Sequence, residues 1–168
     1  MTIILITGGA RSGKSLWAES RTLSFPGRPV YIATAEALDA EMRERIARHQ
    51  ARRGNDWIER EAPLALVEAL DASDGGGARL VDCLTLWLSN LMHADRDCAQ
   101  EAAHLADALA RQSSPVVLVT NEVGLGIVPE NRMARDFRDH AGRLHQMIAA
   151  CATDVYFVAA GLPLKMKG

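Results

Sequence analysis

The sequence predicts an α/β protein with a mostly parallel sheet and helices on both faces. Two observations carry this prediction. Short apolar runs alternate with helical patterns along the chain, and a glycine-rich turn joins the first run to the first helical pattern. Strands buried on both faces are continuously apolar, and strand–helix alternation is typical of a parallel sheet covered on both sides. The length suits one domain, so we expect a single domain over residues 1–168.

Each predicted strand is short, apolar and bounded by turn or polar residues. The predicted strands are Ile3–Thr7, Pro29–Ala33, Ala78–Asp82, Val116–Thr120 and Val155–Ala159. The predicted helices are Lys14–Leu23, Leu38–Arg53, Leu64–Leu70, Leu84–Met92, Cys98–Arg111 and Asn131–Cys151. The last helix is the clearest, because apolar residues recur along it at helical spacing and form one stripe.

The turn after the first strand fits the pattern G-x-x-x-x-G-K-[ST] at every fixed position. It reads Gly8-Gly9-Ala10-Arg11-Ser12-Gly13-Lys14-Ser15. Glycines let the backbone curl so that its N–H groups point at phosphate oxygens, and the following helix adds partial positive charge. We expect Lys14 to reach the β- and γ-phosphates and the Ser15 hydroxyl to bind Mg²⁺. The sequence therefore predicts a P-loop NTPase-type domain that binds a nucleoside triphosphate.

Polar or glycine-rich residues follow four of the predicted strands. These junctions are Thr7–Gly8, Thr34–Glu36, Asp82–Cys83 and Thr120–Glu122. Ligands of open α/β sheets bind at the carboxyl ends of the strands, so we expect the four junctions to converge on one site. Asp82 suits either Mg²⁺, the ribose hydroxyls or a helix N-cap. Glu122 either orients water, holds Mg²⁺ through water, acts as a base toward an acceptor hydroxyl, or only shapes its loop.

The segment 38–53 is unusually rich in charge, with acidic residues first and arginines last. That order complements a helix dipole and explains much of the pattern. His49 falls on the same helical face as Met42, Ile46 and Arg53. A lone histidine on an apolar stripe is more often a packing residue than a catalyst. The neighbouring arginines nevertheless suit a phosphorylated imidazole, because a guanidinium group can bind phosphate through two hydrogen bonds at once.

Composition argues against several classes of function. The formal net charge of −2 gives no basic field for nucleic acid, and no apolar run is long enough for a membrane span. The three cysteines have no C-x-x-C spacing, which favours free thiols in a reducing cytoplasm. Asp74-Gly75-Gly76-Gly77 matches D-x-x-G, but it precedes a predicted strand, and no Asn-Lys-x-Asp segment accompanies it. A regulatory GTPase is therefore not favoured.

Six segments taken together identify a family. They are Gly8–Ser15, Tyr31–Ala35, Arg45–His49, Trp57, Asp82–Leu91 and Asn121–Arg132. The chain resembles the bifunctional adenosylcobinamide kinase / adenosylcobinamide-phosphate guanylyltransferases of cobalamin biosynthesis, from its first strand to its last. The segment Asn121–Arg132 is far more specific to this family than the phosphate loop is. One departure is His145, which stands where the family pattern has Asn.

The resemblance implies two reactions. ATP or GTP phosphorylates the aminopropanol hydroxyl of adenosylcobinamide, and the phosphorylated product then accepts GMP from a guanylylated histidine to give adenosylcobinamide-GDP. The resemblance places that histidine at His49 and implies a homotrimer. It places the nucleotide contacts at Gly8, Gly9, Ala10, Arg11, Ser12, Gly13, Lys14, Ser15, Thr34, Ala35, Glu36, Gln50, Ala51, Arg52, Arg53, Glu61 and Asp82. It leaves open which triphosphate serves the kinase step and whether one nucleotide site serves both reactions.

Two other functions fit the phosphate loop. One is a P-loop small-molecule kinase without nucleotidyl transfer, and the other is a nucleotide-sensing module whose bound nucleotide gates a partner. The presence of His49 among arginines, and the absence of GTPase base-reading and switch motifs, favour the bifunctional enzyme over both.

Overall fold

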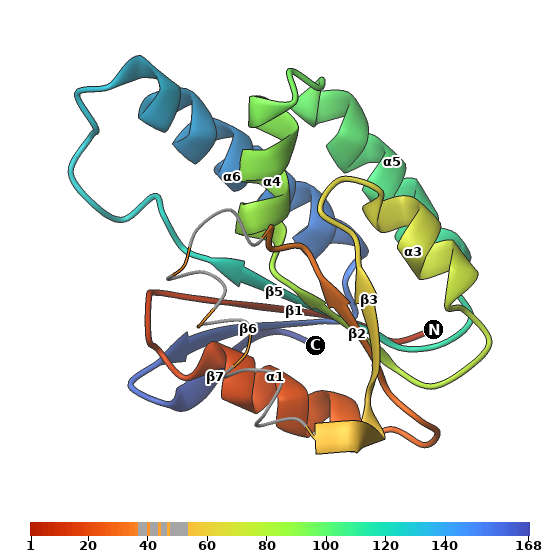
Figure 1. Cartoon of the computed structure of the whole chain (residues 1–168). Helices are drawn as coiled ribbons and strands as arrows, with labels where there is room; N and C mark the ends of the chain where they lie inside the picture. Colours follow the sequence, from red (N-terminus) through yellow and green to blue (C-terminus); the bar gives the residue numbers. More distant parts are fainter. Residues whose placement is uncertain (37–39, 41–43, 45–46, 48–53) are drawn as a thin grey trace.

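The computed structural model describes residues 1–36, 40, 44, 47 and 54–168, and its strands form one seven-stranded sheet (Figure 1). The strand order across the sheet is β3-β2-β4-β5-β1-β6-β7. The strands are β1 (Ile3–Gly8), β2 (Val30–Ala33), β3 (Ile58–Glu61), β4 (Arg79–Asp82), β5 (Val116–Asn121), β6 (Asp154–Ala159) and β7 (Leu162–Lys167). Neighbouring strands are parallel except for the antiparallel hairpin β6–β7.

Helices cover both faces of this sheet, as the sequence predicts. The described α-helices are α1 (Lys14–Leu23), α3 (Leu66–Ala72), α4 (Leu84–His93), α5 (Cys98–Arg111) and α6 (Arg132–Cys151). Figure 1 shows α1 on one face, beside the β6–β7 hairpin, and α3 to α6 together on the other. A short 3-10 turn, η1 (Gly54–Asp56), leads into β3. Strand–helix alternation thus predicted the right fold class.

Side chains of the central strands alternate between two apolar cores. On β1, Ile4 and Ile6 belong to the core on the α1 side, whereas Ile3 and Leu5 belong to the core under α3 to α6. Because both faces are buried, every one of these four positions is apolar. This is why uninterrupted apolar runs predicted the inner strands to within two residues at either end.

The sequence prediction missed both edge strands. In β3, the residues Ile58-Glu59-Arg60-Glu61 are all exposed and mostly charged, and backbone pairing with β2 defines the strand. In β7 all six residues are exposed as well. Charged residues are common on edge strands, where they discourage pairing with another chain. The predicted helix Leu64–Leu70 lies two residues later, as α3, and the predicted helix Leu38–Arg53 falls largely outside the described residues.

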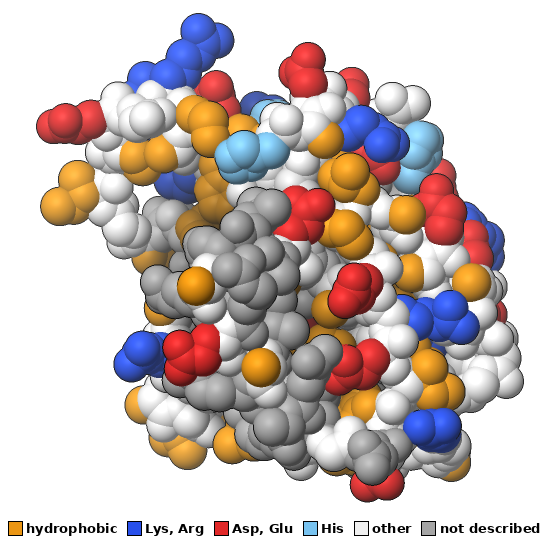
Figure 2. Space-filling view, viewed as in Figure 1, with side chains coloured by type: hydrophobic (Ala, Val, Ile, Leu, Met, Phe, Trp, Pro, Cys, Tyr) orange, Lys and Arg blue, Asp and Glu red, His pale blue; other side chains and the backbone are white. Residues whose placement is uncertain are grey.

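The loop between β5 and α6 carries exposed apolar side chains. Leu125 is 82% exposed and Ile127 is 97% exposed, and Met133 at the start of α6 is 55% exposed. Figure 2 shows hydrophobic side chains on the outer side of this projecting loop. In the part of the chain that the structure describes, no helix is both long and apolar enough to cross a membrane. Cys83, Cys98 and Cys151 are free thiols, as predicted.

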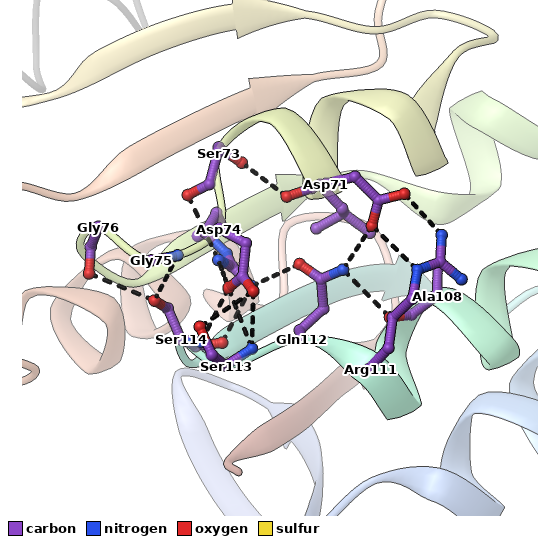
Figure 3. Close-up of polar contacts among 12 residues, drawn as sticks. Asp71, Ser73, Asp74, Gly75, Gly76, Ala108, Arg111, Gln112, Ser113 and Ser114 are labelled. Atoms are coloured by element: carbon purple, nitrogen blue, oxygen red, sulfur yellow. Dashed lines mark hydrogen bonds and ion pairs between the residues drawn. The ribbon is translucent and has the colours of Figure 1, made fainter.

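A buried arginine donates hydrogen bonds to both turns at the amino-terminal edge of the sheet. Figure 3 shows the polar contacts of Asp74, Gln112, Ser113 and Ser114 at this edge. Arg79, the first residue of β4, has no exposed surface. Its Nη1 donates to Asp74 at 2.5 Å, and its Nη2 donates to Gln112 Oε1 at 2.9 Å and to the Ser114 carbonyl at 3.0 Å. The glycine turn that begins at Asp74 therefore belongs to a structural ion pair at the edge opposite the phosphate loop.

Asp74 is held in its charged form by this arrangement. Desolvation raises its pKa, but hydrogen bonds from Arg79, from the Ser114 N–H and from Ser113 outweigh that effect and hold the pKa well below its usual range. The free energy that Asp74 contributes is therefore present above the unfolded-state pKa of about 3.9 and is lost as the pH falls below it.

We expect Asp74→Asn to lower the free energy of unfolding by about 3 kcal/mol, because it leaves the buried Arg79 guanidinium without a counter-charge. Urea unfolding at neutral pH measures the loss. The matched control is Asp136→Asn, because Asp136 pairs with Arg132 at 3.6 Å between side chains that are 50% and 88% exposed. An exposed pair contributes about 1 kcal/mol or less, so equal losses in the two variants would contradict the assignment.

Candidate functional site: a phosphate loop at the carboxyl edge of the sheet

The predicted phosphate loop joins β1 to α1 in a strand–turn–helix arrangement. Gly13 stands at the N-cap of α1 with φ of 94°, and Arg11 also has a positive φ of 54°. No side chain caps α1, so its first N–H groups are left for a ligand. An uncapped helix amino terminus behind a curled glycine loop is a ready anion site. The loop therefore has the local geometry that its sequence predicts.

The β6–β7 hairpin supports this loop from the side. The Gly161 N–H at the tip of the hairpin donates to the Ser12 carbonyl at 2.8 Å. A Cβ atom at Gly13 would lie 3.0 Å from Gly161 Cα, and a Cβ atom at Gly8 would lie 2.4 Å from the Val158 carbonyl oxygen. Glycine is thus required at position 8 by contact, and at position 13 by contact and by backbone angle. Sequence reasoning missed Gly161; its only signal was a glycine two residues after the end of a predicted strand.

Lys14 lies across the phosphate loop. Its side chain is buried, and its Nζ donates to the Gly9 carbonyl at 3.0 Å. The ammonium group therefore already points at the concave side of the loop. In the same loop the Ser12 hydroxyl is buried and has no hydrogen-bond partner. The Thr7 hydroxyl, just before the loop, is also buried and has none. Buried hydroxyls without partners are rare, and they fit a loop that completes its hydrogen bonds with phosphate oxygens.

Asp82 stands at the end of β4, two strands away from β1. Strand spacing puts its backbone about 10 Å from the loop strand. Its Oδ2 accepts a hydrogen bond from the Tyr31 hydroxyl at 2.7 Å, which leaves Oδ1 for a ligand. The alternative that Asp82 caps the next helix is wrong, because Cys83 is the N-cap of α4 and no side chain caps that helix.

Thr34 supports the structure of the site and is not placed to contact a nucleotide directly. It is completely buried, and its hydroxyl donates to the Cys83 carbonyl and accepts from the Cys83 N–H, both at 2.8 Å. Its carbonyl accepts from Asn90 Nδ2 at 2.8 Å. With its polar groups engaged, Thr34 can act on a nucleotide only by fixing the segment of Ala35 and Glu36 that follows.

The remaining predicted contacts extend along the same edge of the sheet. Ala33 is in register with both Asp82 and Glu61, so the ends of β2, β3 and β4 form one row. Glu36 and Glu61 are exposed there. Four strand spacings separate β3 from β1, about 19 Å, so the row reaches well beyond the loop. His49, Gln50, Ala51, Arg52 and Arg53 lie outside the described residues, and their roles remain predictions.

A polar cluster follows β5, the strand next to the loop strand. Thr120 is completely buried, and its hydroxyl lies 2.7 Å from Nε2 of His145, which α6 contributes. Burial lowers the pKa of His145, and the nearby Glu122 carboxylate partly opposes that effect. The Glu122 N–H donates to the Gly8 carbonyl at 3.0 Å, which places Glu122 directly beside the loop.

The chemistry of the site suits a hard divalent cation. Hydroxyl and carboxylate oxygens are the ligands that Mg²⁺ prefers, and it usually takes only one or two from the protein beside the phosphates. Ser15 at the start of α1 and Oδ1 of Asp82 would supply oxygens of this kind. Within the described residues no cluster of three or more metal-ligating side chains occurs.

A family model and two sequence relatives of this chain all indicate the same family. Residues 4–166 match the model of a family described as cobinamide kinase / cobinamide phosphate guanyltransferase. The chain is 48% identical to the bifunctional adenosylcobalamin biosynthesis protein CobP of Pseudomonas aeruginosa, over 98% of this chain and 96% of that protein. It is 41% identical to CobU of Salmonella typhimurium, over 98% of this chain and 99% of that protein.

Among solved structures, the flagellar accessory protein FlaH from Methanocaldococcus jannaschii aligns over 99% of this chain and 78% of its own, with a TM-score of 0.56 and 12% identity. At that identity the likeness concerns the fold alone. Together with the loop between β1 and α1, it confirms the predicted P-loop NTPase-type fold.

We expect Lys14→Ala to weaken the binding of Mg²⁺·GTP about 10- to 100-fold, because a hydrogen bond to a charged group contributes about 1.5–3 kcal/mol. Isothermal titration calorimetry measures the change. Lys165→Ala is the control, since Lys165 lies on the edge strand β7 and pairs with Asp154 at 2.9 Å. Unchanged affinity in Lys14→Ala would show that the loop lysine does not contact phosphate.

His145 gives the protein a pH-dependent stability. Because burial lowers its pKa in the folded state, the unfolded chain takes up the proton first as the pH falls. The free energy of unfolding should therefore fall below about pH 6.5, by at most about 1.4 kcal/mol per pH unit. Urea unfolding at pH 7.5 and 5.5 should show a smaller loss in His145→Asn than in the unchanged protein. His104→Asn, at an exposed position of α5, should not reduce the loss.

Proposed function

The chain belongs to the cobinamide kinase / cobinamide phosphate guanyltransferase family, and on that premise we propose that it catalyses both reactions on adenosylcobinamide. The first step phosphorylates the corrinoid with ATP or GTP. The second transfers GMP from GTP to the phosphorylated corrinoid. The observation that carries the proposal is a complete phosphate loop in a chain that matches this family from its first strand to its last.

In the kinase step, the acceptor hydroxyl oxygen attacks the γ-phosphorus, and the bond from that phosphorus to the β–γ bridging oxygen breaks. The nucleoside diphosphate leaves with the bonding electrons. Lys14 and the N–H groups at the start of α1 would hold the β- and γ-phosphates during this displacement. When bound, Mg²⁺ supplies charge neutralisation at the same oxygens, and the Ser15 hydroxyl and Asp82 carboxylate are the residues proposed to hold it.

In the guanylyl step, an imidazole nitrogen of His49 attacks the α-phosphorus of GTP and pyrophosphate leaves. A phosphate oxygen of the adenosylcobinamide phosphate then attacks the same phosphorus, and the phosphorus–nitrogen bond breaks. The product is adenosylcobinamide-GDP, and the histidine is regenerated. Neutral imidazole is a competent nucleophile near pH 7 and a good leaving group once phosphorylated. Arg52 and Arg53 are proposed to offset the phosphate charge.

Two further properties belong to this proposal. We infer a homotrimer from the family resemblance, and light scattering of the purified protein would test it. We also propose that the enzyme works in the cytoplasm, which three free thiols and the need for nucleoside triphosphates both support.

The covalent step gives the sharpest test. Incubation with α-labelled GTP and Mg²⁺, followed by denaturation, should leave label on the chain that is labile in acid and stable in alkali, as expected of a phosphoramidate. His49→Ala should abolish the label and the formation of adenosylcobinamide-GDP. The same variant should keep its kinase activity within a few-fold, because the γ-phosphoryl transfer does not pass through the histidine.

His104→Ala is the matched control, because His104 is exposed on α5. Label that persists in His49→Ala would rule out His49 as the nucleophile. An unchanged protein that phosphorylates adenosylcobinamide but never carries label would instead indicate a kinase without nucleotidyl transfer.

A further inference from the structure

Glu122 is placed at the phosphate end of the site by the sheet itself. It is the first residue after β5, and β5 is the immediate neighbour of the loop strand β1. Its N–H donates to the carbonyl of Gly8, the first residue of the loop, at 3.0 Å. One strand spacing, about 4.8 Å, therefore separates the Glu122 backbone from the start of the loop.

The Glu122 side chain is held in one orientation. Its Oε1 accepts a hydrogen bond from the Gly124 N–H at 2.5 Å, which leaves Oε2 as the oxygen available to a ligand. A Cβ atom at Gly124 would approach Oε1 to 3.0 Å, so a glycine allows this close contact. The residue is half-buried. A carboxylate fixed in this way costs little reorganisation when it accepts a proton.

His145, on α6, lies near enough to this carboxylate to feel its charge. The hydrogen bond of its Nε2 with the buried Thr120 hydroxyl, 2.7 Å long, fixes the ring. Thr120 and Glu122 are two positions apart at the end of β5, and the charge of Glu122 acts on the imidazole. Because its Nε2 is engaged with Thr120, His145 acts on Glu122 by fixing the end of β5, from which Glu122 follows.

The other described carboxylates at this edge are less suited to act on the γ-phosphoryl acceptor. Asp82 is two strands from the loop strand, and its Oδ2 accepts from the Tyr31 hydroxyl. Glu61 ends β3, four strand positions from β1, and Glu36 follows β2, which is three positions away. Among the described residues, Glu122 is therefore the carboxylate nearest to the phosphate loop along the sheet.

We propose that Glu122 is the general base of the kinase step, a role that rests on the proposed function. Its Oε2 removes the proton from the acceptor hydroxyl as that oxygen attacks the γ-phosphorus. The nucleoside diphosphate leaves with the electron pair of the broken phosphorus–oxygen bond, and the proton passes from Glu122 to solvent afterwards. The guanylyl step has no hydroxyl to deprotonate, because its nucleophiles are an imidazole and a phosphate oxygen. Glu122 thus serves one of the two reactions only.

The test compares the two reactions in Glu122→Gln. Glutamine keeps an oxygen for the Gly124 N–H but cannot accept the proton. We expect the turnover number for phosphorylation of adenosylcobinamide to fall about 10²- to 10⁴-fold. Labelling of the chain by α-labelled GTP should stay within a few-fold. Glu68→Gln, at an exposed glutamate of α3, should change neither reaction.

Three outcomes would overturn the assignment. Kinase turnover in Glu122→Gln that matches the unchanged protein would show that Glu122 is not the base. Equal loss of phosphorylation and labelling would show that it supports the loop and takes no part in the chemistry. A higher KM for nucleotide with unchanged turnover would make it a binding residue.

Substitution of His145 provides a second test, which is read from the kinase turnover number. His145→Ala should lower the kinase turnover number and leave the KM for nucleotide unchanged, whereas His145→Asn should recover much of the turnover by bonding to Thr120. Similar kinase turnover in both variants would remove His145 from the proposal. Failure of the proposed function would look different, because the unchanged protein itself would then form no phosphorylated corrinoid.

Discussion

The contact on which the rest of the site depends is the approach of two glycine turns, one in the phosphate loop and one in the β6–β7 hairpin. A Cβ atom at Gly13 would lie 3.0 Å from Gly161 Cα, and the Gly161 N–H satisfies the Ser12 carbonyl. The hairpin thereby closes one side of the loop by contact with backbone alone. Because that carbonyl is satisfied inside the protein, the loop keeps its curl without a ligand, and its N–H groups stay directed at the space that phosphate would fill.

The sheet order then separates the chemical tasks along one edge. Glu122 is one strand from the loop strand, Asp82 is two strands away, and Glu36 and Glu61 follow strands three and four positions away. The γ-phosphoryl group and its acceptor are thus expected near β5, whereas the nucleoside and α-phosphate are expected toward β2 and β3. The two displacements, one at the γ-phosphorus and one at the α-phosphorus, would then use different residues along the same edge of the sheet. A parallel sheet makes this separation possible, because all its carboxyl ends lie on the same side.

The parts of the structure that were predictable from sequence are those encoded locally. The predicted helix Lys14–Leu23 matches α1 at both ends, because the motif that starts it and the strand before it are contiguous in the chain. Strand β3 carries no such signal, since Ile58–Glu61 is charged and is formed by pairing with β2. The contact of Gly161 with the loop and the pairing of His145 with Thr120 join residues distant in the chain, and only the assembled fold brings them together. Sequence reasoning therefore found the loop but not the residues that support it.

The balance of charge at the carboxyl edge of the sheet offers a physical reason why residues 43–53 are rich in arginine. Among the described residues at the strand ends, Lys14 is a buried cation in the loop, and Arg11 is exposed beside it, whereas Glu36, Glu61, Asp82 and Glu122 are acidic. A triphosphate that approaches this edge meets more negative than positive charge, so its binding requires cations from elsewhere. Mg²⁺ bound with the nucleotide would supply part of that charge. On the proposed function, the rest would come from residues 43–53, which contain five arginines around His49. Guanidinium groups would favour the pentavalent transition state at the α-phosphorus without competing with Lys14 for the γ-phosphate. The same segment would then carry both the nucleophile and the charge that makes its attack on a polyanion possible.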